Sequence, residues 1–329
     1  MKKLLSLVLV LMLALSAFAV ASAEETLKVA VVLSGATGDR SFYDSANEGL
    51  QALVEAGKVE GTLIECKNDA SMFTTNLISA AEDNDVVIAV GWEFWDALAE
   101  YAPQLPDTKF IFIDNGLDGV GDNLMSITYA QNEGSYLVGY IAGKLTQTNV
   151  IGAVGGEDSE TINDFIVGYE AGAKLANPDV EVQVQYAGTY DDPAKGKELA
   201  LALNDAGCDI IFQVASRTGE GVFEAAAEKG FYAIGVDSDQ KYINPDVIIC
   251  SMIKQVGLSI ETVITDLIDN GEWKGGQIWV ADMSTGLVDV GYGDDTMTQQ
   301  VSDELKAEVE DIKQQIISGD IEVPTAFQE

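Results

Sequence analysis

The stretch Phe231-Tyr-Ala-Ile-Gly-Val-Asp237-Ser-Asp239-Gln240 is a short apolar run that ends abruptly in acidic residues. Residues 232–236 have the composition of a buried strand, and Asp237 follows them directly. The run at 109–113 ends in the same way, at Asp114. Ligands of open α/β sheets bind at the carboxyl ends of the strands, so we expect both carboxylates to face a ligand. The alternative is that Asp237 only caps the next turn through its own backbone.

The rest of the chain repeats this pattern of short apolar runs and amphipathic segments. The runs at 86–90 and 210–214 lead into Trp92 and Ser216, which places aromatic and polar groups at the same expected edge. Alternating strands and amphipathic helices are typical of a parallel sheet covered by helices. The pattern restarts after residue 130 without a Pro- or Ser-rich linker. The sequence therefore predicts an α/β protein of two parallel-sheet lobes, with a ligand cleft between them.

The expected domain boundaries follow from where the pattern changes. We expect the chain to cross between the lobes near 126–130, 252–254 and 275–277. Short crossings without a flexible tether would let the lobes close on a ligand as rigid bodies. The resulting division is 24–128 for the first lobe, 129–252 for the second, 253–275 for a return to the first, and 276–329 for the second lobe with a C-terminal helix.

Residues 1–23 have the pattern of a secretory signal peptide. A basic start, Lys2-Lys3, precedes an apolar run at 4–20 and the small-residue site Ala21-Ser22-Ala23. The apolar run is short for a membrane-spanning helix, so a permanent anchor is the weaker alternative. No Cys lies at the cleavage point to carry a lipid. We expect an exported mature protein, periplasmic or secreted, with no membrane insertion after cleavage.

The composition argues against several classes of function. The formal net charge is −36 at pH 7, which disfavours binding to nucleic acid or to an anionic membrane surface. The chain has no His and an odd number of Cys, three, so neither a metal site nor a disulfide framework is expected. It contains no nucleophile elbow and no phosphate loop, and 114–125 is an incomplete calcium loop. We predict no cofactor and no enzyme activity; hydrolysis by a pair of carboxylates is the alternative left open.

Aromatic side chains lie next to glycine-containing turns at two places. Asp39, Phe42 and Tyr43 are on the loop after the first strand, before a helix expected at 44–56. Tyr190 follows a strand of the second lobe. Rings placed at a sheet edge could stack on a flat ligand. The alternative is that Phe42 and Tyr190 pack into their own lobes.

Two more candidates are polar. Ser216 and Gly219 lie between a strand and a helix N-terminus, where free N–H groups point outward. Their alternative is an ordinary helix cap. Lys254 follows the strand at 247–252, beside an expected crossing, and could neutralise Asp237 in the cleft. Its alternative is a solvent-exposed lysine.

Five motifs spread over the mature chain occur together: Gly38-Asp39-Arg-Ser-Phe42-Tyr43, Asn132-Glu-Gly-Ser-Tyr-Leu-Val-Gly139-Tyr-Ile-Ala-Gly143, Gly188-Thr-Tyr190-Asp-Asp-Pro-Ala-Lys-Gly-Lys197, Ala206-Gly207-Cys-Asp209-Ile-Ile-Phe212 and Gly235-Val-Asp237-Ser-Asp239-Gln240. In combination they resemble the basic membrane protein family, the substrate-binding proteins of nucleoside ABC transporters of the purine nucleoside receptor type. The resemblance covers nearly the whole mature chain. It implies the type I periplasmic-binding-protein fold, with two α/β lobes joined by three crossings.

The resemblance also implies roles for the candidate residues. By resemblance, Phe42 and Tyr190 stack on the two faces of a base, and Asp114 and Asp237 hold ribose hydroxyls with Lys254 beside them. The family's binding proteins deliver the nucleoside to the permease of an ABC transporter, and we expect a monomer.

Asp39 and the turn from Ser216 to Gly219 would, by the same resemblance, also lie at the cleft. This chain departs from the family pattern at two positions, with Tyr43 where Asn is usual and Tyr190 where Phe is usual. Both departures bear on which base is preferred. The alternatives from other classes are a sugar-binding protein of the same fold and a nucleoside-hydrolysing enzyme.

Overall fold

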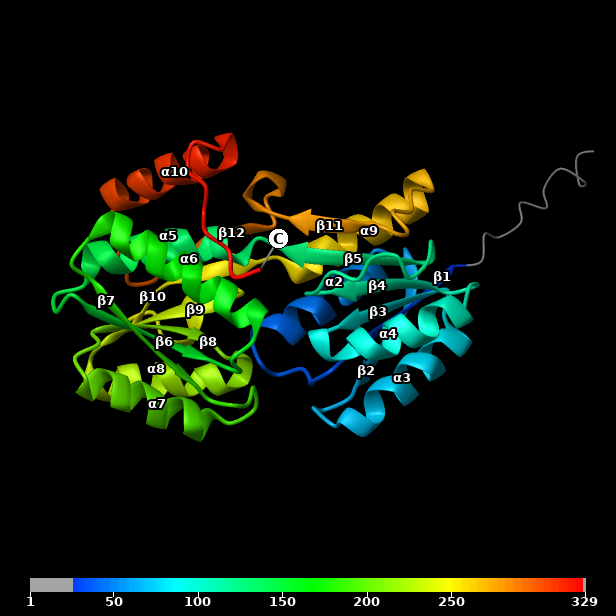
Figure 1. The fold of residues 1–329 in the computed structure, drawn as a ribbon, viewed down its shortest axis with the longest axis horizontal. Coiled ribbons are helices and arrows are strands. Elements are labelled where there is room, and N and C mark those ends of the chain that lie inside the picture. Colours follow the sequence, from blue (N-terminus) through cyan, green and yellow to red (C-terminus); the bar gives the residue numbers. More distant parts are fainter. Residues whose placement is uncertain (1–25, 328–329) are drawn as a thin grey trace, which may run out of the picture.

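The computed structural model describes residues 26–327. The predicted signal peptide, 1–23, lies outside the described residues. Within the described part, none of the helices combines the length and the apolar character needed to cross a membrane. The chain forms two α/β lobes that lie side by side, each built on a six-stranded sheet (Figure 1).

The sheet of the first lobe has the strand order β11-β5-β4-β3-β1-β2, and its pairings are parallel. In β1, Val31 packs on the α2 and α9 side and Val32 on the α3 and α4 side. Both faces of the sheet are therefore buried, as expected of a parallel sheet. The strands are β1 (Leu27–Leu33), β2 (Val59–Glu65), β3 (Val86–Val90), β4 (Lys109–Ile113), β5 (Leu124–Tyr129) and β11 (Ile278–Ala281), and the helices are α2 (Phe42–Glu55), α3 (Ala70–Asp83), α4 (Trp95–Tyr101) and α9 (Val256–Asn270).

The second lobe repeats this plan with the strand order β12-β10-β9-β8-β6-β7. Only β12 is antiparallel to its neighbour, β10, among the described pairings of this sheet. In β8, Phe212 packs on the α5 and α6 side and Ile211 on the α7 and α8 side. The strands are β6 (Val150–Gly155), β7 (Glu181–Tyr186), β8 (Ile210–Val214), β9 (Tyr232–Asp237), β10 (Ile248–Lys254) and β12 (Val288–Gly291), and the helices are α5 (Gln131–Leu145), α6 (Glu160–Ala176), α7 (Pro193–Asp205), α8 (Glu220–Lys229) and α10 (Asp303–Ser318).

The chain crosses between the lobes three times. It passes from β5 to α5 at Ala130, from β10 to α9 at Gln255, and from β11 to β12 through 282–287. The third crossing expected at 275–277 is wrong, and so is the assignment of 276–281 to the second lobe. β11 pairs with β5 in the first sheet, with Ile278 opposite Ser126. The glycine turn at 275–276 returns the chain to that sheet, and the turn that leaves it ends at Gly286, whose φ is +73°.

Helices α5 and α6 of the second lobe pack closely through glycines. A Cβ atom on Gly139 would lie 2.1 Å from the carbonyl oxygen of Tyr169, and one on Gly172 would lie 1.9 Å from that of Tyr136. These distances leave no room for a side chain, so the two helix backbones touch directly. The packing fixes α6, whose N-terminal end borders the gap between the lobes.

Candidate ligand-binding site

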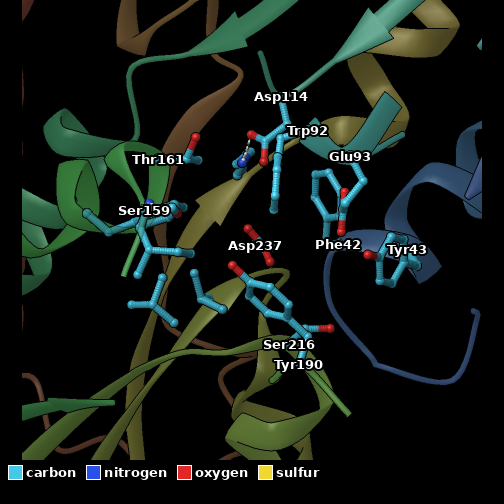
Figure 2. A pocket seen from close by; sticks show the side chains of 16 residues that line it. Phe42, Tyr43, Trp92, Glu93, Asp114, Ser159, Thr161, Tyr190, Ser216 and Asp237 are labelled. Carbon is cyan, nitrogen blue, oxygen red and sulfur yellow. Dashed lines mark hydrogen bonds and ion pairs between the residues drawn. The ribbon is translucent and has the colours of Figure 1, made fainter. Parts of the chain in front are cut away.

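A pocket lies between the lobes, where strands of both sheets end (Figure 2). The space between its lining atoms is about 570 Å³, a figure that includes its opening to solvent. Both lobes contribute to its wall, so its shape depends on how they close. Eight of the ten residues predicted from the sequence line it: Phe42, Tyr43, Trp92, Asp114, Tyr190, Ser216, Asp237 and Lys254.

The strand-end residues owe their position to an unusual backbone. Asp114 and Asp237 have φ of +81° and +64°, and Ser216 has +47°. Non-glycine residues seldom adopt this left-handed region, although Asp tolerates it better than most. The conformation turns the chain sharply as each strand ends and leaves the side chain at the edge of the sheet. Strained backbone of this kind clusters at functional sites, and in Figure 2 both carboxyl groups lie in the pocket.

Lys254 is the buried cation of the pocket. Its side chain is 2% exposed and forms an ion pair with Asp114 Oδ1. Its Nζ atom also lies 5.0 Å from the ring centroid of Phe42, 5.0 Å from that of Tyr129 and 5.3 Å from that of Phe165. The ammonium is therefore held by one carboxylate and three ring faces. The sequence predicted Asp237 as its partner, but the end of β10 brings it directly to Asp114, on the other lobe.

Asp237 is enclosed by both lobes. Its Oδ2 atom accepts a 2.6 Å hydrogen bond from the Ser41 hydroxyl of the first lobe. Burial raises the pKa of the Asp237 carboxyl to about 6, against the lowering influence of Lys254 and Ser41 and with a further raising influence of Asp114 and Asp39. A buried carboxylate with this pKa is ionised at neutral pH but needs donors to stabilise it.

The aromatic groups of the pocket come from both lobes. Phe42 and Tyr43 open helix α2, which begins two residues earlier than predicted, so they are helical rather than loop residues. Their ring centroids are 5.2 Å apart with an edge-on geometry. The hydroxyl of Tyr43 pairs with Ser34 Oγ at 3.0 Å, within its own lobe. Tyr190 enters from the second lobe (Figure 2), and Trp92 lies at the rim, 40% exposed.

Asp39 and Gly219 are not brought to the wall of this pocket. Asp39 is buried and accepts hydrogen bonds from the backbone N–H groups of Ser41, Tyr43 and Asp44. It therefore caps α2, which explains the early start of the helix. It also accepts a 2.9 Å bond from the Ser216 hydroxyl, across the lobes. A Cβ atom on Gly219 would lie 1.8 Å from Gln213 Oε1, so Gly219 packs against that side chain instead.

Sequence reasoning missed several residues of the wall. Glu93 follows Trp92 on the turn after β3, and Ile162 and Phe165 lie on the first turns of α6. The α6 residues could have been found from the end of β6 at Gly155. Strand β6 pairs in parallel with β8, so both strands end at the edge of the sheet that borders the pocket. The further missed polar residues are Ser159 and Thr161.

Comparison with known proteins identifies the family of this chain. The family described as "ABC transporter substrate-binding protein PnrA-like" matches residues 26–326. The chain belongs to this family. The ABC transporter nucleoside-binding protein BmpA of Lactococcus lactis is 36% identical over 325 residues, covering 91% of this chain and 89% of that protein. Basic membrane protein A of Borreliella burgdorferi is 33% identical over 302 residues, covering 91% and 88%.

Among solved structures, the chain is similar to a solute-binding protein of an ABC transporter system from Aeropyrum pernix K1. It superposes with a TM-score of 0.80 at 27% identity, covering 91% of this chain and 94% of that one. The predicted family and the predicted type I periplasmic-binding-protein fold are thereby confirmed. As a member of the PnrA-like family, the chain is a substrate-binding protein of an ABC transporter, a class that works outside the cytoplasm.

Proposed function

We propose that this protein binds a nucleoside, preferably a purine nucleoside, between its lobes and delivers it to the permease of an ABC transporter. The observation that carries the proposal is the combination, in one pocket, of aromatic rings from both lobes with a cluster of two carboxylates and a lysine. A nucleoside offers a flat base and a ribose with adjacent hydroxyl donors. The name of the Lactococcus lactis relative, a nucleoside-binding protein, supports the same class of ligand.

The aromatic side chains of the pocket suit the base. Phe42 comes from the first lobe and Tyr190 from the second, so closure of the lobes would place a base between their rings. Stacking of a base on an aromatic side chain is worth about 1–3 kcal/mol in nucleic-acid complexes. It tolerates different bases, because every base has a π face.

The two carboxylates of the pocket suit the ribose. An ionised carboxylate accepts two hydroxyl hydrogens with its two oxygens, in charge-assisted bonds. Asp237 has one oxygen on Ser41, and Asp114 has one on Lys254, so each retains acceptor capacity for a ligand hydroxyl. Lys254 limits the repulsion between the two carboxylates, which burial would otherwise strengthen.

Export and the partner complete the proposal. The predicted signal peptide at 1–23 would send a monomeric protein across the membrane, where it would meet the permease from outside. Binding without turnover distinguishes this function from a nucleoside hydrolase.

Calorimetry with adenosine, inosine, 2′-deoxyadenosine and free ribose tests the proposal. We expect the parent protein to bind adenosine and inosine, to bind the deoxy analogue more weakly and not to bind free ribose. Asp237→Asn should weaken the two ribonucleosides about ten- to a hundredfold, because an amide meets one ribose hydroxyl with an N–H₂ group.

Binding of ribose without binding of any nucleoside would instead indicate a sugar-binding protein. Chromatography of the same mixtures gives the test for an enzyme, since release of free base from adenosine would contradict a function limited to binding. Equal affinity of the parent and Asp237→Asn for all the nucleosides would rule out the ribose-binding role of Asp237.

A further inference from the structure

Glu93 brings a third acidic group to the pocket and takes no part in the Asp114–Lys254 ion pair. It lies on the turn after β3, next to Trp92, and its carboxyl group lines the same pocket as Phe42 (Figure 2). Burial, and after it the charge of Glu93, raises the pKa of the Tyr43 hydroxyl. The pKa of the Tyr190 hydroxyl is also raised, by burial first, then by Glu157 and then by Glu93. The charge of Glu93 therefore reaches aromatic residues contributed by both lobes.

The local backbone is built to hold this carboxyl group in place. Gly91 has a φ of +118°, and a Cβ atom on it would lie 2.5 Å from Glu93 Oε2 and 2.2 Å from Ser34 Oγ. Only glycine leaves this space free and adopts this backbone without strain. The Glu93 side chain folds into that space, beside the hydroxyl of Ser34.

The hydrogen bonding of this carboxyl group is incomplete. Its Oε2 atom is enclosed and has no hydrogen-bond partner within residues 26–327. The hydroxyls of Ser34 and Tyr43 pair with each other at 3.0 Å, which uses one of their two protons and leaves at most one for Glu93. An ionised carboxylate accepts several hydrogen bonds, so the Oε2 atom lacks a donor.

No cation in the pocket compensates for this deficit among the described residues. Lys254 is paired with Asp114, and no ion pair of Glu93 occurs in residues 26–327. Burial raises the pKa of the Glu93 carboxyl, against the lowering influence of its own backbone N–H and of the Ser34 hydroxyl and with smaller raising effects from Asp114 and Glu157. A donor brought by the ligand would relieve an unfavourable arrangement that the protein itself leaves unsatisfied.

We propose that Glu93 determines which bases the protein accepts, because its carboxylate receives a hydrogen bond from an N–H group on the edge of the base. This inference rests on the proposed binding of nucleosides. It selects bases with an edge N–H, such as the 6-amino group of adenine or the N1–H of a 6-oxopurine. Stacking between rings contributes affinity for any base, whereas Glu93 distinguishes one base from another. Tyr43 supports this role by holding Ser34 beside the carboxylate.

Three ligands that differ only at the base edge test the inference by calorimetry. Adenosine and inosine carry an edge N–H, and purine riboside, with hydrogen at position 6, carries none. We expect the parent protein to bind purine riboside about ten- to a hundredfold more weakly than the other two, the range of a hydrogen bond to a charged group. Glu93→Leu, which has no acceptor, should lose that preference and bind all three about equally, at the level of purine riboside. Glu93→Gln keeps one acceptor oxygen and should therefore keep part of the preference for adenosine and inosine over purine riboside.

Glu157→Gln is the matched control, because it removes a charge that acts on both Tyr190 and Glu93 but does not line the pocket. It should retain the parent's preference. A parent that binds purine riboside as tightly as inosine overturns the inference while leaving nucleoside binding intact. An equal loss of all three ligands in Glu93→Leu overturns it as well, and thermal melts separate that outcome from misfolding. Failure of all three ligands to bind the parent would contradict the proposed function itself.

Discussion

The Ser41 hydroxyl of the first lobe donates a 2.6 Å hydrogen bond to Asp237 Oδ2 of the second lobe. Further hydrogen bonds join the same segment to the second lobe, among them one from Ser216 Oγ to Asp39 at 2.9 Å and one from Gln240 Nε2 to the carbonyl of Arg40 at 3.0 Å. Residues 39–41, the latch loop, therefore bond the two lobes to each other. Closure is coupled to the site because Asp237 takes part in both.

We predict that Ser41→Ala favours the open arrangement of the lobes. Asp237 would lose a donor in its buried position, which destabilises the closed form by about 1–3 kcal/mol. Nucleoside affinity should fall about ten- to a hundredfold, and the radius of gyration of the ligand-free protein should increase in small-angle scattering. Ser238→Ala is the control, because its 3.5 Å contact with the Ser41 carbonyl is long for a hydrogen bond. Equal behaviour of the two variants would contradict a latch at Ser41.

Much of the site was predictable because it depends on local sequence. An apolar run that ends in Asp identifies a strand and its carboxyl end together, and this rule located Asp114 and Asp237 at one cleft. Tyr190 and Phe42 were found from their position beside glycine-containing turns. The helix start at Phe42 was missed by two residues because the capping carboxylate, Asp39, acts from three residues upstream.

What the sequence did not predict depends on contacts between distant segments. The partner of Lys254 is decided by how the lobes meet, and no local pattern distinguishes Asp114 from Asp237 for this role. The four residues of β11 give no indication of which sheet they join, so the third crossing was misplaced. Glu93 was missed because a glutamate on a surface-like turn has no signature until the pocket closes around it.

The α5–α6 contact makes a prediction about stability alone. Gly172→Ala would place a Cβ atom 1.9 Å from the carbonyl oxygen of Tyr136, so the two helices must separate. Overpacking of this kind costs about 1–3 kcal/mol, and more is expected where backbone atoms collide. Thermal melts should show a clear loss for Gly172→Ala and almost none for Glu170→Ala, an exposed change on the same helix. An unchanged melting temperature in Gly172→Ala would mean that the helices are not in backbone contact.

Phe42→Ala should weaken nucleoside binding without unfolding the protein. Phe42 is only partly buried and borders the pocket, and loss of one stacking face is worth about 1–3 kcal/mol. The expected change is a ten- to hundredfold weaker affinity, roughly, with a melting temperature near that of the parent. Phe94→Ala provides the contrast, since Phe94 is fully enclosed in the core of the first lobe. Phe94→Ala should lower the melting temperature and leave the affinity of the folded fraction unchanged. If Phe42→Ala gives this same result, Phe42 is a core residue and not a stacking residue.

Asp237 predicts a pH dependence of nucleoside binding. Burial raises its pKa to about 6, from an ordinary value of 3.8. A ribose that donates two hydroxyl hydrogens needs the ionised form, so the protonated fraction is unavailable for binding. Affinity should therefore fall about tenfold between pH 7 and pH 5. Burial also raises the pKa of Glu93, so the titration is repeated on Glu93→Gln, where the dependence due to Asp237 should persist.

Stability should change in the opposite direction over the same range of pH. The folded protein binds the Asp237 proton more tightly than the unfolded chain does, because the pKa is raised in the folded state. The contribution of this proton to the free energy of unfolding is therefore fully present below about pH 4, and it is lost as the pH rises through 6. The ligand-free parent should thus gain stability relative to Asp237→Asn as the pH is lowered from 7 to 5, while its affinity for the nucleoside declines. Melting curves of the two proteins at several pH values measure this difference. If the difference does not vary with pH, Asp237 is already ionised without penalty, and the decline in affinity must come from another group.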